Sequence, residues 1–217
     1  MPLHIRLAGE SIGLFPERGL FWERGRCLLI ADWHIGKAAT FRAAGIGVPD
    51  GDLDEEFARL DQMLEASGAT ELVILGDLAH ARAGLSEGLA GRMRDWISGC
   101  GARVGLVAGN HDHSAGLADL RGFGLDLLGD SLQRGPFTLQ HEPAAGGSEY
   151  VLAGHLHPAI RLGEGKRGGV RAPCFWFGAK AGVLPAFGGF TGGKRINAVP
   201  GDRVFAVGGS EVIEIPT

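Results

Sequence analysis

The sequence predicts an α/β fold, a layered sandwich in which helices flank two mixed β-sheets. Up to about residue 108, apolar runs that indicate buried strands alternate with amphipathic helical segments, an order typical of a parallel sheet. After about residue 122, short strands follow one another through Gly-rich turns, which indicates a second, largely antiparallel sheet. The 217 residues suit one domain, and no linker, repeat or low-complexity tract interrupts them. We therefore expect a single domain over residues 1–217.

The first half of the chain supplies the predicted parallel sheet. Short apolar runs within residues 3–30 predict two or three antiparallel strands, and a long Gly- and Ala-rich connection after His34 is expected to roof a site beside it. Residues 53–66 predict a helix, because apolar side chains recur there at three- and four-residue steps after a capping Asp50 or Asp52. A strand over 71–75, a helix near 86–98 and a strand over 103–108 follow.

Short strands in the second half supply the second sheet. We expect them near residues 125–128, 131–134, 137–140, 149–153, 159–162, 169–177, 203–207 and 211–215. Phe175 and Phe177 alternate around Trp176. This alternation predicts that the two phenylalanines pack in the core and that Trp176 points the other way.

Charge is unevenly distributed along the chain. The formal net charge of −4 does not by itself indicate a nucleic-acid-binding protein. However, residues 1–160 carry 13 Lys and Arg against 21 Asp and Glu, whereas residues 161–195 carry seven Lys and Arg against Glu164 alone. This asymmetry indicates either an anionic partner or a solvated basic face.

The cysteine content and the absence of long apolar stretches point to the cytoplasm. Cys27, Cys100 and Cys174 form no CxxC pair and are too few for a disulfide scaffold, which fits a reducing compartment. No apolar stretch approaches the ~18 residues that span a bilayer. The N-terminus lacks the basic and then apolar layout of a signal peptide. We expect a cytoplasmic protein with no membrane partner.

Five apolar strands each end at a glycine, a metal-ligand type of residue, or both. In chain order the endings are Asp32-Trp33-His34, Gly76-Asp77, Gly109-Asn110-His111-Asp112, His141 and Gly154-His155-Leu156-His157. Open α/β sheets place their sites at the carboxyl ends of strands, so these side chains are expected to meet. Three histidines lie outside these endings: His4, His80 and His113. For them a structural role stays open beside a role in the site.

The donor types predict two divalent metal ions. Carboxylate, amide and imidazole donors suit Mn, Fe or Zn rather than Ca or a thiolate-bound Zn, and we expect Mn²⁺. Seven side chains are too many for one ion and suit two ions that share a bridging carboxylate, for which Asp77 is the best candidate. His155 and His157 would point to opposite sides of an extended chain, so we assign them to different ions. The first ligand set is Asp32, His34 and His157; the second ligand set is Asn110, His141 and His155.

Two such ions favour phosphoester chemistry. Ions about 3.5–4 Å apart activate a water for in-line displacement at phosphorus and neutralise charge on the phosphoryl oxygens. His111 is not needed as a ligand, and Asp112 follows it directly. An imidazole that a carboxylate orients is a suitable acid for the leaving oxygen. His111 and Asp112 are therefore the predicted catalytic residues.

Together, the five strand endings resemble the calcineurin-like metallophosphoesterase superfamily, in the same order and over residues 27–158. The resemblance implies a metallophosphoesterase-type sandwich of two mixed sheets flanked by helices, and it implies metal-ligand roles that match those assigned above. Members of the superfamily hydrolyse phosphoproteins, nucleotides, lipid-precursor pyrophosphates and nucleic acids. The resemblance therefore does not choose the substrate.

A second set of motifs resembles the bacterial ligase-associated DNA damage response endonuclease branch of this superfamily. It consists of Asp32-Trp33-His34-Ile35-Gly36-Lys37 with the loop over residues 45–49, Pro173-Cys174-Phe175-Trp176-Phe177-Gly178, Gly182-Val183-Leu184-Pro185-Ala186-Phe187-Gly188 and Phe190-Thr191-Gly192-Gly193. This resemblance implies a manganese-dependent nuclease that acts in DNA repair. It also implies a DNA ligase, an exonuclease and a helicase as partners.

The basic, aromatic tail gives independent support for a DNA substrate. Cations interleaved with aromatic rings suit single-stranded nucleic acid, where stacking contributes roughly 1–3 kcal/mol per base. We expect substrate contacts from six residues: Lys37, Arg42, Trp176, Lys180, Lys194 and Arg195. The alternative is that the aromatic rings, including Phe187 and Phe190, form sheet core and that the cations are merely solvated.

The sequence thus predicts a binuclear-metal-dependent DNA endonuclease that acts on single-stranded or flap DNA. Two other functions stay open. A small-molecule phosphoesterase would act on nucleotides or a lipid-precursor pyrophosphate without cutting a polynucleotide. A non-catalytic, metal-bound scaffold for repair enzymes would bind metal without turnover, and the presence of His111 beside a full ligand set argues against it.

Overall fold

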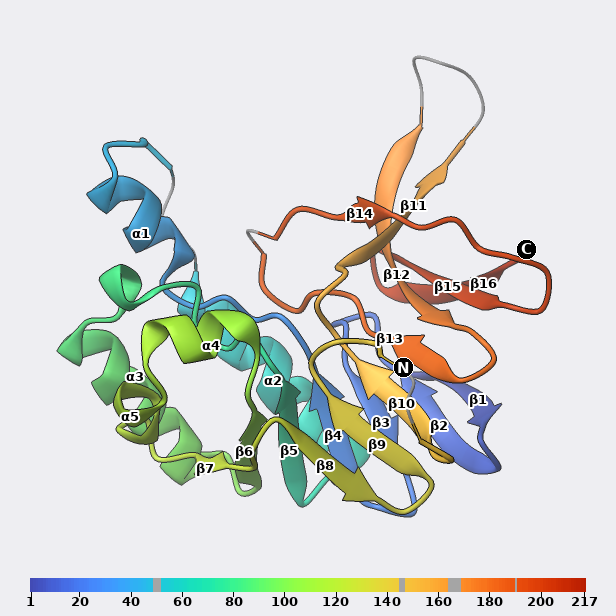
Figure 1. Ribbon diagram of the computed structural model, residues 1–217, viewed down its shortest axis with the longest axis horizontal. Helices are drawn as coiled ribbons and strands as arrows, with labels where there is room; N and C mark the ends of the chain where they lie inside the picture. The colour runs from blue at the N-terminus through green and yellow to red at the C-terminus, as the bar shows by residue number, and fades with distance from the viewer. Residues whose placement is uncertain (49–51, 145–146, 164–168, 190) are drawn as a thin grey trace.

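The computed structural model describes residues 1–48, 52–144, 147–163, 169–189 and 191–217. Two β-sheets face each other, and the described helices lie on the far side of the first sheet (Figure 1). The predicted α/β sandwich of two mixed sheets is confirmed. The described helices flank it on one side only, so the outer face of the second sheet carries none of them.

The first sheet contains seven strands in sequence order. Its first four strands are antiparallel neighbours, where two or three were expected: β1 (Leu3–Leu7), β2 (Glu10–Leu14), β3 (Leu20–Trp22) and β4 (Cys27–Ile30). The parallel half continues through β5 (Glu71–Leu75), β6 (Arg103–Val107) and β7 (Asp126–Leu127). The assignment of residues 125–128 to the second sheet is wrong, because the chain returns after β6 to place β7 parallel to that strand.

Helices connect the parallel strands. They are α1 (Lys37–Ala43), α2 (Leu53–Ser67), α3 (Glu87–Gly99), α4 (Asn110–Ala115) and α5 (Leu117–Arg121), with a 3₁₀ turn at Arg82–Gly84. Crossovers between adjacent parallel strands share one hand, which puts these helices on one face of the sheet. Asp52 caps α2 by accepting the N–H of Glu55, while Asp50 lies outside the described residues. None of the helices in the described ranges is long and apolar enough to cross a membrane.

The second sheet is mixed and is not a simple meander. Its strands are β8 (Ser131–Arg134), β9 (Phe137–Gln140), β10 (Tyr150–Ala153), β11 (Pro158–Leu162), β12 (Val170–Phe177), β13 (Ala181–Val183), β14 (Lys194–Arg195), β15 (Arg203–Gly208) and β16 (Glu211–Ile215). The order is β14-β11-β12-β13-β10-β9-β8, and β15 and β16 extend from β12. Strand β10 pairs in parallel with β9 and β13, and β11 pairs in parallel with β14. The remaining pairs are antiparallel.

Alternating side chains of the central strands divide the core into two layers. Leu28 and Ile30 face the helices, whereas Leu29 on the same strand faces the second sheet. Phe175 and Phe177 are buried in the layer between the sheets, as predicted from their alternation. This packing fixes the two sheets against each other, so the loops that leave their strand ends are held at defined positions.

The edge of the sandwich that carries the predicted ligands is tied across the two sheets. Parallel strands β4, β5 and β6 end at the same edge. An isolated parallel bridge joins Ala31, directly after β4, to Ala186, which follows β13. The five sequence motifs therefore leave the sandwich close to one another.

Candidate metal centre

Backbone hydrogen bonds align the first two ligand-bearing loops. The N–H of Asp32 donates to the Gly76 carbonyl at 3.1 Å, and the N–H of His34 donates to the Asp77 carbonyl at 2.9 Å. The loops after β4 and β5 thus run side by side beyond the sheet, and this pairing places the side chains of Asp32 and His34 next to Asp77.

Backbone strain is concentrated at the predicted ligands. Within the described ranges, eight non-glycine residues have positive φ, and five of them are predicted ligands: Asp32, His34, Asp77, His155 and His157. The left-handed region costs an ordinary residue roughly 1–2 kcal/mol, so a fold retains it only where the surroundings impose it. Here the imposed geometry turns five donor side chains toward one point.

The glycine before each of three ligands makes room for another ligand. A Cβ on Gly76 would lie 2.3 Å from His141 Nδ1, one on Gly109 would lie 2.4 Å from Asp77 Oδ1, and one on Gly154 would lie 2.6 Å from an Asp32 oxygen. These separations are far below van der Waals contact. The Gly-ligand pairs of the sequence therefore interlock, and each motif requires its neighbour to be in place.

The first ligand set converges as predicted. His34 Nε2 lies 3.2 Å from His157 Nε2, and His157 Nε2 lies 3.3 Å from Asp32 Oδ1. One donor atom from each of these three residues falls within a 4.8 Å group. The Asp32 and His34 side chains are almost fully buried. This set can hold one cation.

The second ligand set converges on the other side of Asp77. His141 Nε2 lies 3.1 Å from Asn110 Oδ1 and 3.1 Å from His155 Nδ1. Asp77 Oδ2 lies 3.4 Å from His141 Nε2 and 3.8 Å from His34 Nε2, so one carboxylate oxygen faces both sets. This is the position that the proposed bridging role of Asp77 requires.

Carbonyl oxygens behind two of the imidazoles fix which nitrogen faces inward. His141 Nδ1 lies 3.0 Å from the Leu75 carbonyl oxygen, and His157 Nδ1 lies 3.0 Å from that of Gly192. Each ring donates its Nδ1–H there, so its Nε2 faces the cluster and can bind a metal ion once it carries no proton. Such partners orient metal-binding histidines and raise their basicity.

The charges of the cluster fit divalent cations. Asp32 and Asp77 are buried, and within the described residues only histidines lie within ion-pair distance of either carboxylate. Burial lowers the pKa of His34 to about 3, so this ring is a neutral donor. For His157, burial alone would lower the pKa. The hydrogen bond to Asp32 and the charge of that carboxylate outweigh burial, so the pKa of His157 lies above its ordinary value. Two buried carboxylates among imidazole rings require cationic compensation, which two metal ions would supply.

The orienting group behind His111 differs from the one expected. His111 Nδ1 lies 2.7 Å from the His80 carbonyl oxygen and donates to it. The Asp112 carboxylate instead accepts the N–H groups of Ala79 and Gly109, at 3.0 and 2.9 Å. Asp112 follows the first residues of α4, and from that position its carboxylate folds back onto the helix start rather than toward the neighbouring ring. The expectation that Asp112 orients His111 is therefore wrong.

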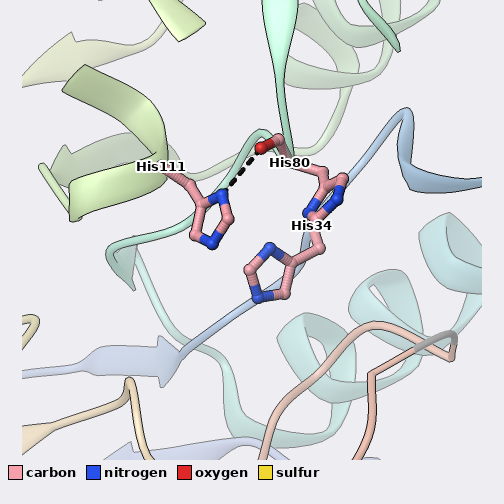
Figure 2. A group of neighbouring side chains, drawn as sticks. All are labelled: His34, His80 and His111. Atoms are coloured by element: carbon pink, nitrogen blue, oxygen red, sulfur yellow. Dashed lines mark hydrogen bonds between the residues drawn. The ribbon is translucent and has the colours of Figure 1, made fainter. Parts of the chain in front are cut away.

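His80 is a residue of the site that the sequence did not single out. Its ring stacks on His111 with centroids 5.0 Å apart, and one donor atom from each of His34, His80 and His111 falls within a second 4.8 Å group (Figure 2). The signal was its place three residues after Asp77 on the same loop. Since His34 Nε2 is turned toward the first ligand set, we treat His80 as a neighbour of that set rather than as a ligand.

The six predicted substrate contacts separate into two groups. Lys37 and Arg42 line a cavity of about 550 Å³ that His34 also lines. The N–H of Lys194 donates to the His157 carbonyl, and Arg195 follows it on β14, so both lie beside the first ligand set. By contrast, Trp176 Nε1 donates to Asp202 Oδ2 at 2.8 Å. The Lys180 carbonyl accepts the N–H of Val151, so Lys180 lies beside the first residues of β10, at the opposite end of that strand from His155. The structure thus does not bring Trp176 and Lys180 to the metal centre.

Some residues named in the sequence analysis lie outside the described ranges. They are Asp50, Glu164 and Phe190, and with them Pro49 of the loop over residues 45–49 and two of the seven basic residues within 161–195, Lys166 and Arg167. The corresponding expectations for the basic, aromatic tail therefore rest on the remaining residues of that segment.

A fold of two facing mixed sheets with this ligand cluster at one edge defines a metallophosphoesterase, a metal-dependent hydrolase of phosphoesters. The family model of the calcineurin-like phosphoesterases matches residues 25–157, which contain all seven predicted ligands. The chain belongs to the calcineurin-like phosphoesterase family.

One solved structure supports this assignment. The crystal structure of the nuclease MPE from Pseudomonas putida matches with a TM-score of 0.84 and 34% identity, over 99% of this chain and 100% of that chain. Yfce, a phosphoesterase from E. coli, matches with a TM-score of 0.44 and 15% identity, over 87% of this chain and 97% of that chain. No curated protein sequence matches significantly. The resemblance on which the family was expected is thus confirmed, and a nuclease is among the structures similar to this chain.

Proposed function

We propose that this chain is a two-metal phosphodiesterase that cuts single-stranded or flap DNA internally. The observation that carries the proposal is the position of Asp77, whose Oδ2 faces His34 Nε2 on one side and His141 Nε2 on the other. The similarity to a nuclease at 34% identity over nearly the whole chain supports a nucleic-acid phosphodiester as the substrate.

Seven side chains would hold the two ions. Asp77 would be shared, the first ligand set would complete one ion and the second ligand set would complete the other. When bound, two divalent ions supply an activated water at neutral pH and neutralise charge on the phosphoryl oxygens. The donor set suits Mn²⁺, which is our proposed metal.

His111 is the proposed proton donor to the leaving oxygen. Its Nε2 lies 4.0 Å from Asp77 Oδ2, and its side chain is 37% exposed, so this nitrogen faces both the centre and the substrate side. The hydrogen bond from Nδ1 to the His80 carbonyl persists when the ring is protonated, and it holds Nε2–H toward the cluster. His111 thus has the geometry to deliver a proton beside the ions.

The setting of the enzyme forms part of the proposal. Three free cysteines fit a reducing cytoplasm. The tail motifs that resemble the ligase-associated endonuclease branch support a role in DNA repair, beside a DNA ligase, an exonuclease and a helicase. We also propose that residues 1–217 act as one metallophosphoesterase domain.

A specific observation keeps a small-molecule phosphoesterase as the second candidate. The cavity of about 550 Å³ beside His34 falls in the size range of pockets that enclose small ligands. A nucleotide could therefore place its phosphate at the ions and its base in this cavity.

Cleavage of a circular single-stranded DNA separates these functions, because a circle has no ends for an exonuclease. Metal-stripped protein would be tested with Mn²⁺, Zn²⁺, Mg²⁺ and Ca²⁺ added back separately, and Asn110→Ala would be the control variant. The proposal predicts linearisation that requires Mn²⁺ and Asn110. Intact circles together with hydrolysis of bis(p-nitrophenyl) phosphate would assign a small-molecule substrate, and metal binding without either activity would assign a scaffold.

A further inference from the structure

Open space lies on both sides of the first ligand set. The cavity of about 550 Å³ is lined by His34, and a second cavity of about 210 Å³ is lined by His157. Arg18 and Gly189 line both cavities, so the two meet beside the first ligand set. An enzyme that cuts inside a strand needs such a two-sided path, because the chain continues in both directions from the phosphate that is cut.

The smaller cavity opens onto a face of three adjacent strands. β11 begins directly after His157, pairs with β12 on one side and with β14 on the other, and projects with β12 from the rest of the second sheet (Figure 1). The register sets Arg161 opposite Arg171 and sets Arg195 beside Ala159. Directly opposed residues share a face, and so do residues two apart on one strand. Arg161, Arg171 and Arg195 therefore point to one side, which we call the arginine face.

Contacts around Gly193 confirm that this side is the one that borders the smaller cavity. A Cβ on Gly193, two residues before Arg195, would lie 2.7 Å from Ala159 Cβ and 3.5 Å from Arg171 Cδ. Arg171 Nη1 donates to the Gly193 carbonyl at 2.8 Å. Ala159, Arg171 and Gly193 all line the cavity next to His157. The arginine face is thus continuous with the metal centre.

The three strands that form this face carry charged side chains of one sign only. Strands β11, β12 and β14 contain no Asp or Glu along their whole described lengths, and the three arginines are exposed. A guanidinium has five N–H donors, so Arg171 retains donors beyond the one it gives to Gly193. Planar guanidinium groups bind phosphate oxygens in a bidentate manner.

We propose that the arginine face binds the phosphate backbone of the DNA strand on the His157 side of the cleaved bond. This inference rests on the proposed nuclease function. It adds the side of the metal centre on which the continuing strand is held. The narrow, glycine-lined cavity next to His157 admits backbone, whereas the wider cavity next to His34 has room for bases. The continuity with the metal centre favours a nucleic-acid strand over an acidic protein partner. Binding of an acidic protein would not require the face to extend to His157.

The salt dependence of DNA binding tests the inference independently of cleavage. Binding of a labelled oligo(dT) would be followed by fluorescence anisotropy with metal-stripped protein, which leaves the probe uncut, for wild type, Arg171→Ala, Arg195→Ala and the double variant. Each lost phosphate contact should weaken binding about fivefold and should reduce the slope of log K against log salt by ~0.7. Hydrolysis of bis(p-nitrophenyl) phosphate, which lacks a continuing strand, should fall by a smaller factor than DNA binding does in each of these variants.

Two further variants sharpen the test. Arg121→Ala removes an exposed arginine on α5 and controls for net charge, so its slope should match that of wild type. Lys194 precedes Arg195, but the register pairs it with Pro158 on the opposite face, so Lys194→Ala should lose less affinity than Arg195→Ala. Equal losses in these two variants, or an unchanged slope in the double variant, would overturn the inference. If wild-type protein fails to cut the circular DNA, the proposed function fails instead, and the two failures are thereby distinguished.

Discussion

The Nε2 atoms of His34 and His157 lie 3.2 Å apart, although 123 residues separate them in the chain. Burial keeps the His34 ring neutral, and the Gly192 carbonyl takes the Nδ1–H of His157, so the Nε2 atoms of both rings face each other beside the Asp32 carboxylate. Once they carry no protons, donors that converge in this way repel one another unless a cation lies among them. Backbone strain and buried charge are thus concentrated at a cation site.

Replacing the shared carboxylate should remove both ions. Asp77→Asn keeps the size of the side chain but removes its charge, and we expect loss of phosphodiester hydrolysis together with loss of bound metal. Metal content would be measured by elemental analysis, and activity on bis(p-nitrophenyl) phosphate. Asp95→Asn, an exposed position on α3, is the matched control and should retain both. An Asp77→Asn protein with full metal content would contradict the shared role.

Asp112 and His111 should fail in different ways. Asp112→Ala leaves the buried N–H groups of Ala79 and Gly109 without their acceptor, so we expect a loss of about 3 kcal/mol in the free energy of unfolding. His111→Ala should leave stability nearly unchanged and should lower kcat by roughly 10²–10⁴. Denaturant unfolding and steady-state kinetics would separate the two. A stable Asp112→Ala protein that matches His111→Ala in kcat would restore the catalytic role for Asp112.

The metal-free protein should lose stability as the pH rises above neutrality. Burial lowers the pKa of His141, but the hydrogen bond and charge of Asp77 outweigh burial and raise the pKa to about 9. The unfolded chain has the ordinary pKa of about 6.5, so protonated His141 stabilises the fold fully below pH ~6.5, and this contribution is lost as the pH rises through about 9. Thermal unfolding between these pH values should show the decline.

The matched comparison for this pH dependence is His141→Gln. In the metal-free state this variant should lack the part of the slope that belongs to His141. Saturating Mn²⁺ should also remove it in wild type, because the metal holds the ring deprotonated. A metal-free wild type whose midpoint stays flat from pH 6.5 to 9 would contradict the assignment.

The interlocking glycines should tolerate no side chain. In Gly109→Ala the new Cβ would lie 2.4 Å from Asp77 Oδ1, so the carboxylate must move, and we expect a 10- to 100-fold loss of metal affinity. Gly99→Ala is the matched control, because a Cβ there meets nothing within 4 Å at the end of α3. Calorimetric titration with Mn²⁺ would measure both. Equal affinities in the two variants would show that Asp77 is not held by this contact.

Much of the fold and most of the ligand set could be predicted from the sequence. The helix expected over 53–66 is Leu53–Ser67, because its apolar spacing and its cap at Asp52 are local signals. The ligands were predictable because each follows an apolar strand directly, and parallel strands bring their ends to one edge. These features depend on neighbours in the chain, so a single sequence contains them.

Features that depend on tertiary contacts were not predictable in this way. Asp112 follows His111 in sequence, yet the turn at the start of α4 directs its carboxylate to Ala79 and Gly109. The pairing of β7 with β6, and the strands β13 and β14, depend on partners distant in the chain. His80 and Arg18 acquire their places only when the loops pack together, and neither stands at a strand end that the motif pattern marks.

The number of bound Mn²⁺ ions and their magnetic coupling test the central claim most directly. Metal-stripped protein would be titrated with Mn²⁺ and followed by electron paramagnetic resonance, with Asp77→Asn as the control. We predict two ions per chain with an exchange-coupled spectrum, because the two ligand sets share one carboxylate, and no coupled signal in the variant. A single ion per chain, or two ions without coupling, would contradict the binuclear centre.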